Sequence, residues 1–302
     1  MKMVFMTSKG RAYAVTAAVA SLILSLSGCG GSAATGATAT APETVDVVVA
    51  FYPFQFVAER VAGPHASVAN LTQPGSEPHD LELTARETAA ISTADLVVYE
   101  RSFQPAVDEA VSQSGHDRVL DTTTVVPLQA ADPHVWLDPA NLTTIAGAVA
   151  RQLSAADPSH AADYAANAET LVRDLTTLGA ELDAGLAHCT RTEFITTHAA
   201  FGYLARRVGY REIGISGLSP DAEPYPARVA EVQREAREHG ITTIFYETLV
   251  SPAVAKSIAG DLGLATDVLD PIEGITESSR GSDYLAVMRS NLAALRTANG
   301  CT

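Results

Sequence analysis

Long apolar runs, lysine and cysteine are all scarce in this 302-residue chain. The one extended apolar segment, 12–26, is shorter than the ~20 residues that a membrane-spanning helix needs. Lys256 is the only lysine beyond the first few residues, and the formal net charge is −15. A strongly acidic chain is repelled by phosphate backbones, which argues against a nucleic-acid-binding function.

The first 29 residues have the pattern of a secretory signal. Positively charged residues precede the apolar segment, which ends in Leu-Ser-Gly-Cys29. This ending resembles the bacterial lipobox, in which the cysteine is lipidated and begins the mature protein. We therefore predict a signal peptide over 1–29, lipidation of Cys29 and a flexible linker over 30–44. The alternative is an ordinary signal with an incidental cysteine.

Two cysteines remain after Cys29 is assigned to the anchor. Outside the cytoplasm such a pair is more often bridged than free. A bridge between Cys189 and Cys301 would fix the C-terminus to the body of the protein. Two free thiols remain the alternative.

Short apolar strands alternate with helices in two parts of the chain, 45–138 and 188–302. In the first part, strands are predicted at 45–51, 66–71, 95–99 and 119–120, with helices over 53–61, 84–93 and 105–114. In the second part, strands are predicted at 193–197, 212–215, 242–246 and 267–269, with a last helix over 283–296. This alternation predicts an α/β fold of two βα lobes with mainly parallel sheets.

Linking helices are predicted for 139–187, between the two lobes. Asp157 and Pro158 are typical of a helix start, as cap and first-turn residue. Beyond them, leucines recur at helical spacing and form one apolar stripe. A helix over 158–187 would be roughly 45 Å long, enough to join both lobes as a backbone.

Three isolated histidines, His79, His134 and His198, occur where a strand or an extended segment ends. Neutral imidazole is the commonest protein ligand for zinc. Residues so far apart in sequence can meet only if the fold brings these ends together. The pattern therefore predicts a metal site in the interlobe cleft. The other five histidines lie in polar helices and turns, and we expect them to be solvated.

The order of motifs around these histidines resembles one known family. The segments that carry the resemblance are 51–54, 74–80, 133–139, 197–203, 219–224, 250–254 and 269–271. Together they resemble the substrate-binding lipoproteins of bacterial metal-uptake ABC transporters, the zinc- and manganese-binding cluster with a rigid backbone helix. The resemblance covers nearly all of the chain after the linker.

By position, the resemblance implies that His79, His134, His198 and Asp270 are the metal ligands. Manganese-selective members usually carry glutamate in the third position, where this chain has His198. Imidazole suits zinc, whereas manganese prefers oxygen donors. We therefore expect Zn²⁺ as the transported ligand, with Mn²⁺ as the alternative. The His-rich loop of many zinc-binding members is absent from 121–132, so no auxiliary capture site is predicted.

Three carboxylates are candidates for orienting a metal-binding histidine through its second nitrogen. Glu247 ends a strand of the second lobe, and Asp138 and Glu223 are similar candidates. A helix cap or a turn hydrogen bond explains each of them equally well. Trp136 is expected to pack in the core beside His134.

The resemblance implies a monomeric zinc receptor, lipid-anchored at the extracytoplasmic face of the bacterial cell membrane, that delivers the ion to an ABC permease. An alternative is a secreted zinc hydrolase with three histidine ligands and Glu247 as general base. Asp270 discriminates, because a fourth protein ligand would close the site. The lack of a His-Glu-x-x-His motif counts against the common zinc proteases. Cell adhesion, an effect of some family members, cannot be read from the sequence.

Overall fold

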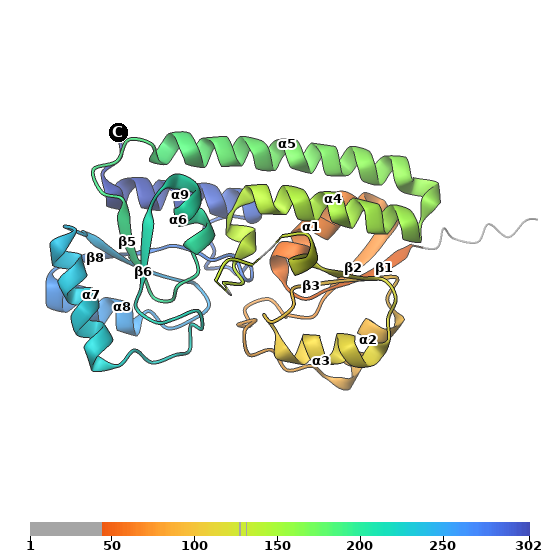
Figure 1. Ribbon diagram of the computed structural model, residues 1–302, viewed down its shortest axis with the longest axis horizontal. Helices are drawn as coiled ribbons and strands as arrows, with labels where there is room; N and C mark the ends of the chain where they lie inside the picture. Colours follow the sequence, from red (N-terminus) through yellow and green to blue (C-terminus); the bar gives the residue numbers. More distant parts are fainter. Residues whose placement is uncertain (1–43, 127, 131) are drawn as a thin grey trace, which may run out of the picture. The chain divides into compact units, whose positions relative to one another are not determined.

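The computed structural model describes residues 44–302, with the exception of 127 and 131. The described residues belong to one compact unit, in which two α/β lobes lie against a layer of long helices (Figure 1). The predicted signal peptide, Cys29 and the linker up to residue 43 lie outside the described residues. In the part of the chain that is described, no helix is both long and apolar enough to cross a membrane.

The first lobe is built on a four-stranded parallel sheet in the order β2-β1-β3-β4. Its elements are β1 (Val45–Val49), α1 (Tyr52–Ala62), β2 (Ala66–Asn70), α2 (Ala85–Thr93), β3 (Leu96–Tyr99), α3 (Pro105–Ser114) and β4 (Val119–Asp121). The central strand β3 is buried at every position. Its unbroken apolar sequence follows from the helices that cover both faces of a parallel sheet.

The second lobe repeats this plan with the strand order β6-β5-β7-β8, again all parallel. Its elements are β5 (Glu193–Thr196), α6 (Gly202–Val208), β6 (Arg211–Gly214), α7 (Pro226–Glu238), β7 (Thr243–Tyr246), α8 (Ala253–Leu262), β8 (Ala265–Val268) and α9 (Tyr284–Asn299). Each strand predicted from the sequence lies within two residues of an observed strand. The predicted fold class, two parallel βα lobes joined by a long helix, is confirmed.

The helical layer consists of α4 (Pro139–Ala156), α5 (Ala161–Leu186) and α9. The 26-residue helix α5 contacts α1 of the first lobe and both α6 and α9 of the second. Its predicted start is wrong by one turn, because Pro158–His160 form a 3-10 turn before the α-helix. Asp157 caps this short turn by accepting a hydrogen bond from the backbone N–H of Ser159.

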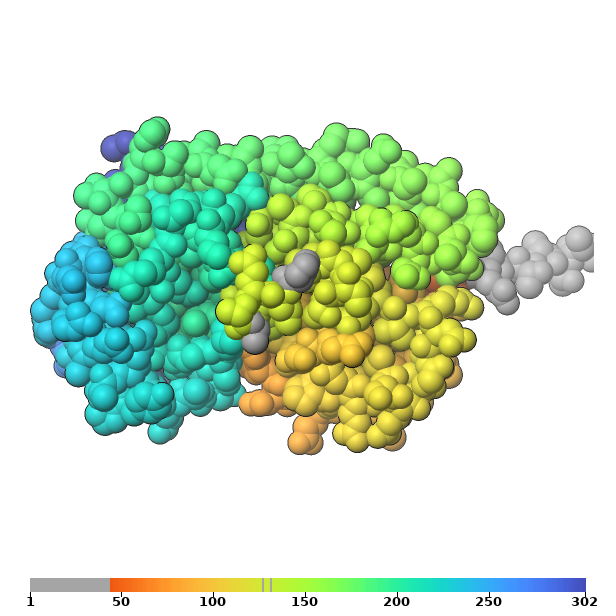
Figure 2. Space-filling view, in the orientation of Figure 1, coloured from red at the N-terminus to blue at the C-terminus, as the bar shows by residue number. Residues whose placement is uncertain are grey.

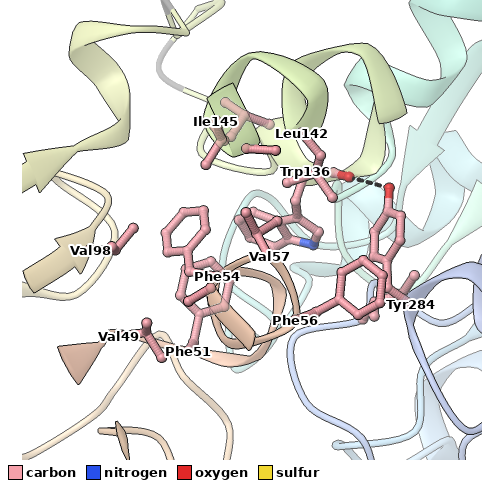
Figure 3. Close-up of a cluster of buried hydrophobic side chains, with 14 of the residues drawn as sticks. Val49, Phe51, Phe54, Phe56, Val57, Val98, Trp136, Leu142, Ile145 and Tyr284 are labelled. Atoms are coloured by element: carbon pink, nitrogen blue, oxygen red, sulfur yellow. Dashed lines mark hydrogen bonds between the residues drawn. The ribbon is translucent and has the colours of Figure 1, made fainter. Parts of the chain in front are cut away.

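The core beneath these helices is continuous between the lobes. Trp136 is fully buried, and its ring lies 4.7 Å from that of Phe51 (Figure 3). Its Nε1 donates to the carbonyl oxygen of Pro271 over 2.7 Å, and Tyr284 Oη donates to the carbonyl oxygen of Trp136 over 2.6 Å. Trp136 is thus a core residue, as predicted, and it also joins the first lobe to the second.

A disulfide joins Cys189 to Cys301. Backbone hydrogen bonds flank it on both sides: Thr190 N donates to Gly300 O, and Thr302 N donates to His188 O. The C-terminus is therefore fixed beside the segment that leads from α5 into the second sheet.

Candidate metal centre

Four side chains converge between the lobes: His79, His134, His198 and Glu273. His79 follows β2, His134 precedes α4, His198 follows β5 and Glu273 follows β8. In a parallel sheet the carboxyl ends of the strands lie along one edge, where ligand sites of α/β proteins form. The two lobes meet along a seam beneath the helical layer (Figure 2). One ligand atom from each of the four residues lies within 4.8 Å of the others.

The spacing of these four ligand atoms fits a tetrahedral ion. Glu273 Oε1 lies 3.4 Å from His79 Nε2, 3.3 Å from His134 Nε2 and 3.7 Å from His198 Nε2. His134 Nε2 and His198 Nε2 are 3.4 Å apart. A tetrahedral zinc with bonds of about 2.0–2.1 Å separates its ligand atoms by about 3.3–3.4 Å. Three of these four separations are within about 0.1 Å of that value and the fourth, at 3.7 Å, is slightly longer, so the spacing is compatible with one tetrahedral zinc ion.

The hydrogen bonding of the cluster is incomplete. Both carboxylate oxygens of Glu273 and the Nε2 atom of His79 are buried without a hydrogen-bond partner among the described residues. Glu273 is fully buried. A buried carboxylate is costly unless a positive charge and further ligands compensate it. The chemistry of the donor set, three imidazoles around one carboxylate, therefore suits a bound divalent cation.

Asp270, which the resemblance assigns to the ligand set, lies outside this cluster. Its Oδ1 accepts a hydrogen bond from Ile272 N over 2.8 Å, and its Oδ2 accepts one from Thr248 Oγ1 over 3.2 Å. Ile272 has a φ of 60°, which is unfavourable for a β-branched residue. Asp270 stabilises this turn, and the turn brings Glu273 to the histidines. In the geometry of the cluster, Glu273 therefore takes the place that the resemblance gives to Asp270, and the sequence analysis did not name Glu273.

His134 is held by Asp132. One oxygen, Asp132 Oδ1, accepts hydrogen bonds from the backbone N–H of His134 over 3.0 Å and from its ring Nδ1 over 2.8 Å. A proton on Nδ1 leaves the lone pair on Nε2, which faces Glu273. Asp132 was not among the predicted carboxylates. The signal in the sequence is its place two residues before His134, where aspartate commonly accepts the i+2 backbone N–H.

His198 is held in the same way by Glu247, which directly follows β7. Glu247 Oε1 lies 2.8 Å from His198 Nδ1 and also accepts a hydrogen bond from Thr197 Oγ1 over 3.2 Å. Both side chains of the pair are 2% exposed, so water does not compete for this hydrogen bond. Glu247 thus has the geometry expected of a carboxylate that orients a ligand.

The two other predicted carboxylates do not contact a histidine of the cluster. Asp138 is the N-cap of α4: its Oδ1 accepts hydrogen bonds from Ala140 N over 3.0 Å and from Arg207 Nη1 over 2.8 Å. Glu223 is exposed in the loop before α7, and within the described residues it forms no hydrogen bond with a histidine. For Asp138, the helix-cap interpretation applies.

His79 is placed by packing and by its backbone. Its ring packs edge-on against Phe103, with centroids 4.6 Å apart. Its backbone N–H donates to Glu77 Oε2 over 3.0 Å, and Gln104 Nε2 donates to the carbonyl oxygen of Pro78 over 3.1 Å. In the described part of the chain, no carboxylate accepts a hydrogen bond from His79 Nδ1. His79 therefore lacks the partner that the other two histidines have.

Protons compensate the charge of Glu273 when no metal is bound. Burial opposes protonation of His198, but Glu247 and Glu273 outweigh it and raise the pKa of His198 to about 10. Burial likewise opposes protonation of His134, and Asp132 and Glu273 raise its pKa. Burial favours the neutral form of Glu273, but the three histidines hold its pKa well below the ordinary value. A metal ion entering this site would replace imidazole protons.

The remaining histidines are less solvated than expected. Only His188 is exposed, whereas His65, His116, His160 and His239 are partly buried. The rings of His65 and His160 stack with centroids 3.9 Å apart. None of these five belongs to the cluster between the lobes.

The long helix α5 packs against both lobes. Together with the two parallel α/β lobes, it places the chain in the class of two-lobed substrate-binding proteins. The chain belongs to the family described as "Zinc-uptake complex component A periplasmic" (ZnuA), whose family model matches residues 47–298.

Named relatives and a solved structure agree with this assignment. The "High-affinity zinc uptake system protein ZnuA" of Bacillus subtilis (strain 168) is 30% identical over an alignment of 303 residues. The match covers 92% of this chain and 95% of the relative. The "Zinc-binding lipoprotein AdcA" of Streptococcus pneumoniae (strain ATCC BAA-255 / R6) is 33% identical over 276 residues. That match covers 83% of this chain and 55% of AdcA, so the chain spans about half of that relative.

The fold of this chain is similar to a crystal structure of the Zn(II)-bound ZnuA-like domain of Streptococcus pneumoniae AdcA. The TM-score is 0.75 at 34% sequence identity, and the match covers 85% of this chain and 99% of that domain. The similarity therefore extends over nearly all of the described residues.

Proposed function

We propose that this protein is an extracytoplasmic receptor that binds zinc and delivers it to the permease of an ABC importer. The observation that carries the proposal is the convergence of three imidazoles on one fully buried carboxylate, whose Oε1 lies 3.3–3.7 Å from each Nε2 atom. The names of the relatives support it, since one is a high-affinity zinc uptake protein and another is a Zn(II)-bound domain.

The proposed zinc ligands are His79, His134, His198 and Glu273. Asp132 and Glu247 are proposed to fix the protons of His134 and His198 on Nδ1, so that both Nε2 atoms face the ion. Three nitrogen donors to one carboxylate favour zinc, whereas manganese prefers oxygen-rich sites. Manganese is the competitor that an experiment must include.

A closed set of ligands argues against the hydrolase alternative. Catalytic zinc sites keep one position open for a water molecule or the substrate. Although Asp270 lies elsewhere, Glu273 supplies a fourth protein donor. The base proposed for the hydrolase, Glu247, is bound to His198 Nδ1. The family, a component of an uptake complex, also favours a receptor.

The contacts between the lobes support release by local rather than large movements. Trp136 Nε1 binds the carbonyl oxygen of Pro271, and Arg207 of the second lobe binds Asp138 of the first over 2.8 Å. The helix α5 packs against both lobes. We therefore propose that the permease triggers release through shifts of the ligand loops. Lipidation at Cys29 and a monomeric state are part of the same proposal, and AdcA is itself named a lipoprotein.

Titration calorimetry at pH 7.5 in two buffers of different ionisation enthalpy tests the proposed function. We expect one zinc ion per chain, a release of protons on binding, and weaker binding of manganese. Equal or tighter binding of manganese would contradict the zinc assignment. A chain that binds neither ion would contradict the receptor assignment.

A further inference from the structure

Helix α6, in the second lobe, contacts the segment that precedes His134 in the first lobe. Tyr203 is buried, and its hydroxyl donates to the carbonyl oxygen of Asp132 over 3.2 Å. The same hydroxyl accepts a hydrogen bond from the backbone N–H of Gln129 over 2.8 Å. The guanidinium of Arg206 covers the ring of Tyr203 at 4.7 Å and lies 4.0 Å from Asp132 Oδ2. Two hydrogen bonds of Tyr203 and one charge contact of Arg206 therefore connect α6 to Gln129 and Asp132.

Gly202 lies directly against the carboxylate of Asp132. A Cβ atom at position 202 would stand 2.6 Å from Asp132 Oδ2, closer than any normal non-bonded contact. The backbone of Gly202 is helical, so left-handed geometry does not require this glycine. The close approach of Asp132 requires it, because a side chain here would occupy the place of Oδ2.

Asp132 cannot yield to such a side chain without disturbing His134. Its Oδ1 holds both the backbone N–H and the ring Nδ1 of His134. Rotation of the carboxylate to move Oδ2 away from position 202 would carry Oδ1 out of both hydrogen bonds. The carbonyl of Asp132 is held by Tyr203, which restricts a shift of the backbone.

We infer that Gly202 and Tyr203 are positioning residues for the zinc site: through Asp132, a helix of the second lobe sets the orientation of His134, a ligand of the first lobe. This inference rests on the proposed zinc-binding function. It means that the orientation of one metal ligand depends on the contact between the lobes.

Zinc affinity of the full chain, measured by competition with a chromogenic chelator, tests the inference. Partners that orient a ligand typically contribute about 10- to 100-fold to metal affinity, and we expect a loss of this size for Gly202→Ala. Gly260→Ala is the matched control, because no atom lies within 4 Å of a Cβ at that helical position. The control should bind zinc as tightly as the wild type.

A double-mutant cycle distinguishes positioning from a general structural effect. In the Asp132→Ala background the clash is removed, so Gly202→Ala should cost less than about twofold in additional affinity. An equal loss in both backgrounds would overturn the inference. The d–d absorption bands of the cobalt(II)-substituted protein report ligand geometry directly. They should change in Gly202→Ala and stay unchanged in Gly260→Ala.

Tyr203→Phe provides a second test if Gly202→Ala does not fold. It keeps the ring under Arg206 and removes the hydroxyl that holds Gln129 and Asp132. We expect a loss of about three- to tenfold in zinc affinity, smaller than that from removing a direct partner of the ligand. Unchanged affinity and an unchanged cobalt spectrum would overturn the inference while leaving the proposed function intact. A wild-type chain that does not bind zinc would instead overturn the proposed function.

Discussion

His134 and His198 differ from His79 in what holds the imidazole. The first two rings are almost completely buried, and each has a carboxylate on its Nδ1, from Asp132 or Glu247. The ring of His79 is 11% exposed and rests against an aromatic side chain. Two of the proposed ligands are thus oriented by hydrogen bonds among the described residues, and the third is placed by its loop. Ligands locked by their neighbours bind a metal with less reorganisation than mobile ones.

Alanine at a histidine ligand should have the largest effect on zinc affinity. We expect His134→Ala or His198→Ala to weaken binding roughly 300-fold, about a quarter of the binding free energy of a tight zinc site. His79→Ala should weaken zinc binding about tenfold, because a ligand that no carboxylate orients contributes less to the affinity. Competition titrations against a chelator give these ratios. Equal losses of affinity for all three variants would show that a carboxylate on Nδ1 makes no difference to the contribution of a ligand.

Substitutions at Glu273 and at Asp270, which both follow β8, should differ almost as strongly in their effect on zinc affinity. Glu273→Gln removes a charged donor, and we expect a loss of about a hundredfold. Asp270→Asn keeps an acceptor for Ile272 N and should change affinity by less than about threefold. Thermal unfolding of both variants without metal checks that the fold is retained. A larger loss from Asp270→Asn than from Glu273→Gln would restore Asp270 as the ligand.

The next largest losses of zinc affinity are expected for the carboxylates that are hydrogen-bonded to His134 and His198. Glu247→Gln and Asp132→Asn keep the shape of the side chain but remove its charge, and each should weaken zinc binding about 10- to 100-fold. Glu223→Gln is the control, since Glu223 is exposed. A neutral result for Glu247→Gln would show that the hydrogen bond to His198 does not orient the ligand.

Zinc affinity should rise with pH. The pKa of His198 is raised to about 10, so its ring carries a proton at neutral pH that must leave on binding. The pKa of His134 is also raised, which acts in the same direction. Each proton released gives about a tenfold gain in affinity per pH unit. Titrations between pH 6.5 and 8 should show this slope. An affinity independent of pH would mean that zinc displaces no protons.

The raised pKa of His198 has the opposite effect on the stability of the metal-free protein, which should fall as the pH rises. A raised pKa means that protonated His198 stabilises the fold below its unfolded pKa of about 6.5. This contribution is lost as the pH rises toward about 10. The melting temperature with a chelator present should therefore fall between pH 7 and pH 10. A melting temperature that rises over this range would contradict the ion-pair network.

Much of the fold could be predicted because its signals are local. Apolar runs such as 95–99 are typical of buried parallel strands. The three histidines stood out because each follows an extended segment, and the ends of parallel strands meet at one edge. The start of α5 was misplaced because a proline after a capping aspartate suits both an α-helix and the 3-10 turn that forms.

The missed site residues depend on backbone geometry that sequence patterns do not specify. Glu273 directly follows Ile272, whose left-handed conformation no preference of isoleucine predicts. Asp132 binds its neighbour His134, but its orientation depends on a glycine 70 residues further along the chain. Asp138 and Glu223 were predicted to orient a histidine from their charge and position alone. In the structure Asp138 is the N-cap of α4.

A crystal structure of the zinc-loaded protein, with an anomalous difference map at the zinc edge, tests the central claim most directly. The account predicts one peak about 2.0–2.2 Å from the Nε2 atoms of His79, His134 and His198 and from a carboxylate oxygen of Glu273. A peak bound by Asp270 in place of Glu273, or one that lacks any of the three imidazoles, would contradict it.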